Sequence, residues 1–180
     1  MKVWLASASP RRRMLLEAAG VEVEVHPSDA PEHRDPAHDP VTHAVAVAVR
    51  KAQGPAARLV LAADTVVHLG DTLFEKPVDR EEARRHLHAL SGRWHEVTTG
   101  VCVRNGARVL TTFVTTRVRF RALADADIER YLATGEADDK AGAYGIQGAA
   151  AAFVAEVHGS YTNVVGLPVE ETLALLGRAA

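Results

Sequence analysis

The sequence predicts an α/β protein in which helices surround a β-sheet, and three observations predict it. Segments with the patterns of strands and of helices alternate along the chain. The apolar run from Leu59 to Val67, rich in β-branched residues, indicates a strand buried on both faces, although periodicity alone does not exclude a buried helix. Asn105-Gly106 lies between two long β-prone segments and is the strongest hairpin signal in the chain. We expect a single domain over residues 1–180.

The composition is ordinary for a globular protein. Of 180 residues, 47% are hydrophobic and 24% are charged, and the formal charge of −2 gives no support to general nucleic-acid binding. The single cysteine, Cys102, excludes an internal disulfide and lies between two valines, which favours a core residue over a nucleophile. Neither a signal peptide nor a membrane-spanning run is indicated, so we expect a cytoplasmic protein.

Asp64 is the one charged residue in the central apolar run. Burying an unpaired carboxylate costs several kcal/mol. We therefore expect Asp64 at a strand end, facing a cleft and accompanied by a cation. A turn cap or a pair with a structural arginine would explain the same residue without any function.

The first elements are a strand at Val3–Ala6 and a helix that begins after Ser9. Ser9 is a favoured N-cap, Pro10 suits the first helical position, and Gly20 is a plausible stop. Arg11–Arg13 occupy the first turn, where they oppose the helix dipole. Because backbone N–H groups, serine hydroxyls and guanidinium groups converge there, we interpret the first two arginines as phosphate-binding. A solvated basic face is the alternative, and the third arginine favours it.

A strand at Val21–Val25, an irregular loop and a helix from Asp39 to Gln53 follow. Lys51 lies near the end of this helix, where compensation of the helix dipole is sufficient to explain it. Three regularly spaced histidines in the loop raise the question of a metal site: His33, His38 and His43. We reject such a site, because regular spacing in a loop fixes no coordination geometry and no cysteine accompanies the histidines.

Turn and cap signals give the remaining elements. Gly70-Asp71 predicts a tight hairpin, and Asp79 and Asp125 are expected to cap helices. The expected helices cover residues 80–90 and 125–135, and a C-terminal helix starts near residue 168. The expected strands cover residues 96–104, 108–121 and 152–157. A loop is expected through residue 163.

Two further segments bear on phosphate binding. Lys76 precedes Pro77, which holds it extended near a strand end and suits a charge aimed at phosphate, although an exposed lysine is the default. The glycine-rich segment 138–148 lacks the spacing of a P-loop or of a dinucleotide fingerprint, so it supports neither enzyme class.

Six motifs in order resemble the Maf family of nucleoside triphosphate pyrophosphatases, also called septum-formation proteins, over nearly the whole chain. The resemblance implies an elongated α/β fold like that of the inosine triphosphate pyrophosphatases, with a mixed β-sheet flanked by helices and a central cleft between two lobes. It also implies metal-dependent cleavage between the α- and β-phosphates. The motifs are Leu5-Ala6-Ser7-Ala8-Ser9-Pro10-Arg11-Arg12, Ala63-Asp64-Thr65, Lys76-Pro77, Ser91-Gly92-Arg93-Trp94-His95, residues 139–148 and Asn163-Val164-Val165-Gly166-Leu167-Pro168.

The resemblance also assigns roles to individual residues. Asp64 matches the catalytic proton acceptor and a metal partner, and Glu32 matches a metal-side glutamate. The residues that match phosphate-binding groups are Ser7, Arg12, Lys51 and Lys76. Two positions depart from the family pattern: Pro31 replaces the usual acid before Glu32, and Glu75 replaces the usual glycine before Lys76.

Three residues match the branch of the family that prefers dTTP and UTP over 7-methyl-GTP. They are Arg12, Thr65 and Gln147. A glutamine amide donates and accepts at once, which fits the O4/N3 edge of a uracil or thymine ring.

The expected chemistry is hydrolysis assisted by a divalent cation, Mg²⁺ or Mn²⁺, held by Asp64 and Glu32, with the nucleoside triphosphate as substrate. Neither a nucleic acid nor a membrane is expected as a partner, and a homodimer is compatible with the sequence. Two alternatives stay open: a purine enzyme of the inosine/xanthosine triphosphate type, and a non-catalytic nucleotide-binding regulator of septum formation.

Overall fold

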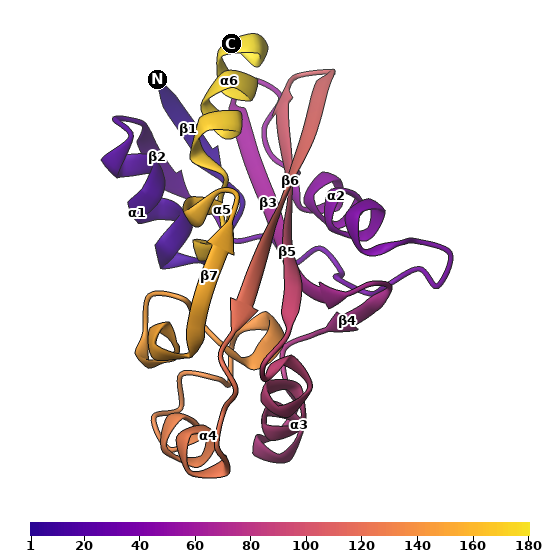
Figure 1. Cartoon of the computed structure of the whole chain (residues 1–180). Coiled ribbons are helices and arrows are strands. Elements are labelled where there is room, and N and C mark those ends of the chain that lie inside the picture. Colours follow the sequence, from indigo (N-terminus) through magenta and orange to yellow (C-terminus); the bar gives the residue numbers. More distant parts are fainter. The chain divides into compact units, whose positions relative to one another are not determined.

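Strands and helices alternate through the chain as its sequence predicts, and the computed structural model describes every residue from Met1 to Ala180 (Figure 1). Its strands are β1 (Lys2–Leu5), β2 (Glu22–Val25), β3 (Leu59–Leu69), β4 (Thr72–Phe74), β5 (Trp94–Asn105), β6 (Arg108–Phe120) and β7 (Val154–His158). Its helices are α1 (Pro10–Ala18), α2 (Pro40–Lys51), α3 (Arg80–Leu90), α4 (Asp125–Leu132), α5 (Tyr161–Val165) and α6 (Val169–Ala179), with short 3₁₀ helices at Ala141–Ala143 and Ala149–Phe153.

The seven strands form one mixed sheet. Its order is β2-β1-β3-β5-β6-β7, and β4 pairs with β3 beside this path. β1 runs parallel to β2 and β3, whereas β4 and β7 run antiparallel to their neighbours β3 and β6. The predicted α/β class with a mixed sheet is therefore confirmed. None of the helices is long and apolar enough to cross a membrane.

The chain divides into two compact units, each assembled from separate stretches of sequence. Unit 1 contains Met1–Thr65, Thr98–Val114 and Thr162–Ala180, and unit 2 contains Val66–Val97 and Thr115–Tyr161. The strands β3, β5 and β6 each begin in one unit and end in the other. That the whole chain acts as one domain stays a prediction.

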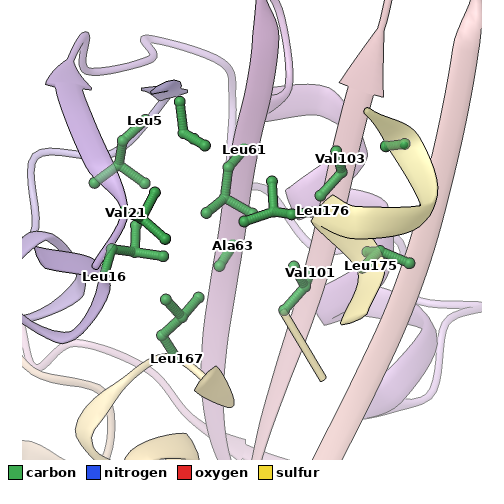
Figure 2. Close-up of a cluster of buried hydrophobic side chains, with 12 residues drawn as sticks. Leu5, Leu16, Val21, Leu61, Ala63, Val101, Val103, Leu167, Leu175 and Leu176 are labelled. Carbon is green, nitrogen blue, oxygen red and sulfur yellow. The ribbon is translucent and has the colours of Figure 1, made fainter. Parts of the chain in front are cut away.

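The part of β3 in unit 1 is covered on both faces, as its unbroken apolar run predicts. On one face, Leu61 and Ala63 pack in a cluster with side chains of α1 and α6 (Figure 2). On the other face, Val60 and Ala62 pack in a cluster with Ala48 of α2 and Ala52, the C-cap of that helix. Cys102 belongs to this second cluster and is fully buried, and burial raises the pKa of its thiol to about 11, so the predicted core role is confirmed.

Capping side chains set the starts of α1, α2 and α3. Ser9 accepts from the N–H of Arg12, Asp39 accepts from the N–H groups of Val41 and Thr42, and Asp79 accepts from that of Glu82. The prediction that Asp125 is an N-cap is wrong. Ala124 holds that position and Asp125 is the first residue of α4, where its negative charge still favours the positive end of the helix dipole.

Two predictions near the C-terminus also need correction. The expected strand at 152–157 begins at Val154, because the alanine-rich segment Ala149–Phe153 forms a 3₁₀ helix, in keeping with the helical preference of alanine. The expected loop through residue 163 contains the helix α5. Gly166 closes this helix with φ of 132°, a conformation that residues with a side chain rarely adopt.

The core of unit 2 contains a buried histidine among aromatic rings. His95 Nε2 lies 2.7 Å from the hydroxyl of Tyr144, and Phe120 and Tyr144 contact the imidazole edge to face. Burial lowers the pKa of His95 from its ordinary 6.5 to about 4, and the nearby charge of His68 acts in the same direction, while a hydrogen bond with the backbone of Arg93 opposes it. The folded protein therefore keeps this imidazole neutral down to acidic pH.

A first prediction concerns the close approach of α2 to β5 at Gly100. A Cβ atom on this residue would lie 2.5 Å from the carbonyl carbon of Ala44, so Gly100→Ala should lower the free energy of unfolding by about 2 kcal/mol or more. In α6, a Cβ on Gly177 would meet nothing within 4 Å, so Gly177→Ala should raise it by about 0.5–1 kcal/mol. Urea denaturation measures both changes, and equal effects of the two substitutions would contradict the packing.

A second prediction concerns the pH dependence of stability. Because the folded-state pKa of His95 lies below its unfolded value, the unfolded chain binds more protons between pH 6.5 and about 4, and stability falls as the pH drops through this window. The loss from this residue should reach about 3 kcal/mol at most. His95→Gln should remove this component from the pH profile of urea denaturation, and the exposed His88→Gln should leave it in place. Identical acid slopes in wild type and His95→Gln would refute the assignment.

Candidate active site

The candidate site in unit 1 is organised around two neighbouring residues in the middle of β3. Asp64 and Thr65 follow each other in the strand, so their side chains leave opposite faces of the sheet. The prediction that Asp64 lies at a strand end is wrong, because β3 continues to Leu69 and pairs with β4. A carboxylate and a hydroxyl therefore leave the same point of the strand on opposite faces, and each has its own partners.

The face of Asp64 carries the cation that the sequence predicts. Lys51, the last residue of α2, places its Nζ 2.8 Å from Asp64 Oδ1 and 2.6 Å from Glu32 Oε1. The side chains of Lys51 and Asp64 are only 9% and 12% exposed. Two carboxylates thus face one ammonium, and the charge of Arg12 also acts on both carboxylates.

The two ion pairs of Lys51 differ in strength. The pair with Asp64 is buried, and removing one partner of a buried pair costs about 3–5 kcal/mol because the other charge is left uncompensated. Glu32 is half exposed, and a pair at such a site contributes about 1 kcal/mol or less. Glu32 also lies in the irregular segment between β2 and α2, where ordering each residue costs about 1–2 kcal/mol. The Lys51 contact alone is therefore too weak to order the backbone around Glu32.

The face of Thr65 carries Arg12 from α1. The guanidinium donates from Nε to the carbonyl of Gly166 (2.8 Å), from one terminal nitrogen to Ser7 Oγ (3.1 Å) and from the other to Thr65 Oγ1 (3.0 Å). Burial lowers the pKa of Arg12, and the charges of Asp64 and Glu32 oppose this effect, so both carboxylates act electrostatically on the guanidinium. An arginine side chain has five N–H groups. Three of those of Arg12 donate to neutral oxygens, and two remain for an anionic ligand.

The hydrogen bonds of Arg12 continue through two threonine hydroxyls to the backbone. Thr65 Oγ1 lies 2.9 Å from Thr99 Oγ1, and Thr99 donates to the carbonyl of Asn163 at 3.3 Å. A guanidinium can only donate and a carbonyl can only accept. Thr65 Oγ1 accepts from Arg12, and its own proton has two acceptors within reach, Thr99 Oγ1 and the carbonyl of Gly166 at 3.4 Å, so the network connects Arg12 with the backbone of both Asn163 and Gly166.

The structure brings together six of the residues singled out in the sequence. Ser7, Arg12 and Thr65 are joined by hydrogen bonds, and Glu32 and Asp64 both contact Lys51. Lys76 and Gln147 are exposed residues of unit 2, and their part in the same site stays a prediction.

The structure separates Arg12 from Arg13 at the start of α1. Arg12 is engaged in the site, whereas Arg13 is exposed and pairs with Glu17 on the same helix, as expected for a solvated face. Sequence reasoning missed the contributions of Thr99 and Gly166. Gly166 lies inside the motif at residues 163–168, but nothing in the sequence marks its carbonyl as a partner of Arg12.

The carboxylates of Asp64 and Glu32 are the hard oxygen donors that Mg²⁺ and Mn²⁺ prefer. No group of three or more His, Cys, Asp or Glu side chains that could hold a metal is present. This donor set fits a Mg²⁺-like cation, which commonly takes one or two carboxylates and completes its octahedron with phosphate oxygens and water.

Comparison with known proteins gives a consistent result. A family model described as Maf-like protein matches residues 2–179. A relative from Anaeromyxobacter dehalogenans strain 2CP-C is 52% identical over 97% of this chain and 92% of its own length, and one from Chromobacterium violaceum is 47% identical over 97% and 93%. A relative from Pyrococcus furiosus is 43% identical over 97% and 94%. Each of the three is named dTTP/UTP pyrophosphatase.

Among solved structures, the Staphylococcus aureus Ham1 protein aligns with a TM-score of 0.47 and 11% identity, over 67% of this chain and 72% of that one.

A third prediction tests the buried ion pair. Lys51→Met keeps the volume of the side chain but leaves Asp64 without its counter-charge, so the free energy of unfolding should fall by roughly 3 kcal/mol. Lys2→Met breaks two exposed ion pairs, with Glu22 and Glu24, and should cost less than about 1 kcal/mol. Adding Asp64→Asn to Lys51→Met should restore part of the loss in urea denaturation. If the two lysine variants were equally stable, the Lys51 pair would not act as a buried one.

Proposed function

The chain belongs to the Maf family, whose model matches nearly all of it, and from this premise we propose that it is a nucleotide pyrophosphatase that hydrolyses dTTP and UTP. The names of relatives at 43–52% identity support this activity. The observation that carries the proposal is the buried Asp64–Lys51 pair with Glu32 beside it, a carboxylate and ammonium cluster next to the apolar contact between β3 and α2.

The proposed reaction is attack of water on the α-phosphorus. A bond forms between the water oxygen and phosphorus, the bond from phosphorus to the α–β bridging oxygen breaks, and pyrophosphate leaves with that oxygen. Asp64 accepts the proton of the attacking water. Because Lys51 donates to Oδ1 of this carboxylate, we assign Oδ2 as the oxygen that accepts the proton. The products are a nucleoside monophosphate and pyrophosphate.

Positive charge is needed to bind four negative charges of a triphosphate. We assign this role to Lys51, Lys76 and the two remaining N–H groups of Arg12, with the hydroxyl of Ser7 as a further donor. Arg12 has the least freedom of these groups, because three bonds already fix its guanidinium plane. A guanidinium fixed before substrate arrives loses little conformational entropy on binding.

Asp64 and Glu32 would hold a divalent cation, Mg²⁺ or Mn²⁺. Such a cation, bound together with the substrate, would neutralise part of the phosphate charge. The side chains of Asp64, Glu32 and Lys51 together carry one negative charge in excess, and a divalent cation held there would reverse that sign.

Arg12, Thr65 and Gln147 are the proposed determinants of the preference for dTTP and UTP. The first two form a single unit, since Arg12 donates to the hydroxyl of Thr65. A change at either residue would therefore remove a hydrogen bond of the other. Gln147 is exposed in unit 2, and its amide offers the donor and acceptor pair that a uracil or thymine edge requires.

A fourth prediction tests the activity and its catalytic group. With Mg²⁺ or Mn²⁺ present, dTTP and UTP should release pyrophosphate faster than the other common nucleoside triphosphates. Asp64→Asn should lower kcat at least about 100-fold, as expected for loss of a general base. Asp125→Asn, a change at an exposed aspartate of α4, should leave the rate unchanged.

The outcomes separate the alternatives. Faster turnover of inosine or xanthosine triphosphate would assign the protein to the purine enzymes, and nucleotide binding without pyrophosphate release would indicate a regulator. Near wild-type turnover by Asp64→Asn would remove Asp64 from the mechanism. Hydrolysis in ¹⁸O-water adds a check on the bond that breaks, because the label should enter the monophosphate and not pyrophosphate.

A further inference from the structure

Arg50 makes a two-pronged contact with the backbone on either side of Glu32. Its Nε donates to the carbonyl of Pro31 at 3.0 Å, and a terminal nitrogen donates to the carbonyl of His33 at 3.1 Å. The two accepting carbonyls belong to the residues directly before and after Glu32. The planar fork of a guanidinium can hold two acceptors in a fixed relation, which an ammonium cannot.

The neighbouring residue of the same helix contacts the side chain of Glu32. Lys51 follows Arg50 in the last turn of α2, and its Nζ lies 2.6 Å from Glu32 Oε1. Arg50 thus holds the backbone of Glu32 while Lys51 holds its carboxylate. Both anchors come from the end of one helix, so the position of Glu32 is tied to that of α2.

This backbone contact supplies what the exposed ion pair lacks. The carboxylate of Glu32 is half exposed, and its pair with Lys51 is too weak to order the surrounding irregular segment. Hydrogen bonds from a charged donor are stronger than neutral ones, and Arg50 makes two of them to adjacent sites. Pro31 adds a fixed φ angle next to Glu32, which further limits the backbone there.

We propose that Arg50 is a positioning residue for the reaction: it fixes the peptide segment Pro31-Glu32-His33 so that the Glu32 carboxylate lies beside Lys51 and Asp64 as a cation ligand. The inference rests on the proposed function, in which Glu32 and Asp64 hold the divalent cation. Arg50 itself contacts neither substrate nor cation in this scheme. It acts through Glu32.

The first test compares Arg50→Ala with a matched control. Loss of an outer partner of a metal ligand typically costs 10–100-fold in metal affinity or activity, so the Mg²⁺ or Mn²⁺ concentration for half-maximal dTTP hydrolysis should rise at least about tenfold. Arg50→Lys should recover only part of this loss, because an ammonium does not reproduce the fork. Arg178→Ala removes an exposed arginine from the last turn of α6 and should leave the metal requirement unchanged.

A double-mutant cycle tests whether Arg50 acts through Glu32. Glu32→Gln removes the proposed ligand charge and should also raise the metal requirement. If Arg50 only positions Glu32, then adding Arg50→Ala to Glu32→Gln should change the metal requirement less than twofold. If the rise in metal requirement of the double variant equalled the product of the two single rises, the proposal would be overturned.

A readout without catalysis distinguishes failure of this inference from failure of the proposed function. In ¹⁵N relaxation of the full chain, the backbone order parameters of Glu32 and His33 should fall below about 0.6 in Arg50→Ala and stay near those of wild type in Arg178→Ala. Unchanged order parameters would overturn the positioning role. A wild-type chain that released no pyrophosphate would refute the proposed function, whereas the relaxation result would still decide whether Arg50 fixes this segment.

Discussion

The buried pair between Lys51 and Asp64 is the interaction on which the candidate site depends. Every other side chain of β3 that faces α2 in unit 1 is apolar, and an isolated carboxylate at this depth would be strongly destabilising. α2 ends with the residue that compensates this charge, so the packing of the helix and the presence of the carboxylate require each other. A core of alanines on α2 and β3 permits the close approach, because small side chains let a lysine at the helix end reach the strand.

Arg12 plays the corresponding part on the opposite face of β3. Its three hydrogen bonds connect α1, β3 and the turn after α5, segments that are far apart in sequence. The relay through Thr65 and Thr99 extends this connection to β5 and the backbone of Asn163. The guanidinium is thus both a structural link and the group with two N–H donors left for a ligand. Its orientation is fixed by these contacts within the fold.

The sequence was sufficient for features that depend on local or periodic signals. The strand around Asp64, the N-caps Ser9, Asp39 and Asp79, and the buried position of Cys102 all follow from pattern, cap chemistry or burial preference. Local signals failed where tertiary context decided the outcome. Asp64 lies within its strand and not at the end, since a buried counter-ion from another element removes the need for solvent.

For a related reason, the sequence could not predict the partners of the site residues. Lys51 alone could be explained by the helix dipole, and only its distances to Glu32 and Asp64 reveal another role. Thr99 and Gly166 carry no chemical signature, because a threonine in a strand and a glycine after a helix are common. Their contribution is a hydroxyl and a carbonyl presented to residues distant in sequence, which no spacing rule can detect.

The charges of the cluster constrain how a triphosphate and a cation could bind. Asp64, Glu32 and Lys51 together carry one formal negative charge, so the two carboxylates oppose the approach of a phosphate chain. A divalent cation reverses that sign, so the cation and the triphosphate should each strengthen the binding of the other, as linkage requires. The half-exposed Glu32 is suited to this coupling, since its weak pair with Lys51 can be exchanged for a cation at little cost, whereas the buried pair of Asp64 stays in place. One carboxylate is thus fixed by burial and the other by its backbone, and the ammonium between them keeps the two acids from repelling each other before the cation arrives.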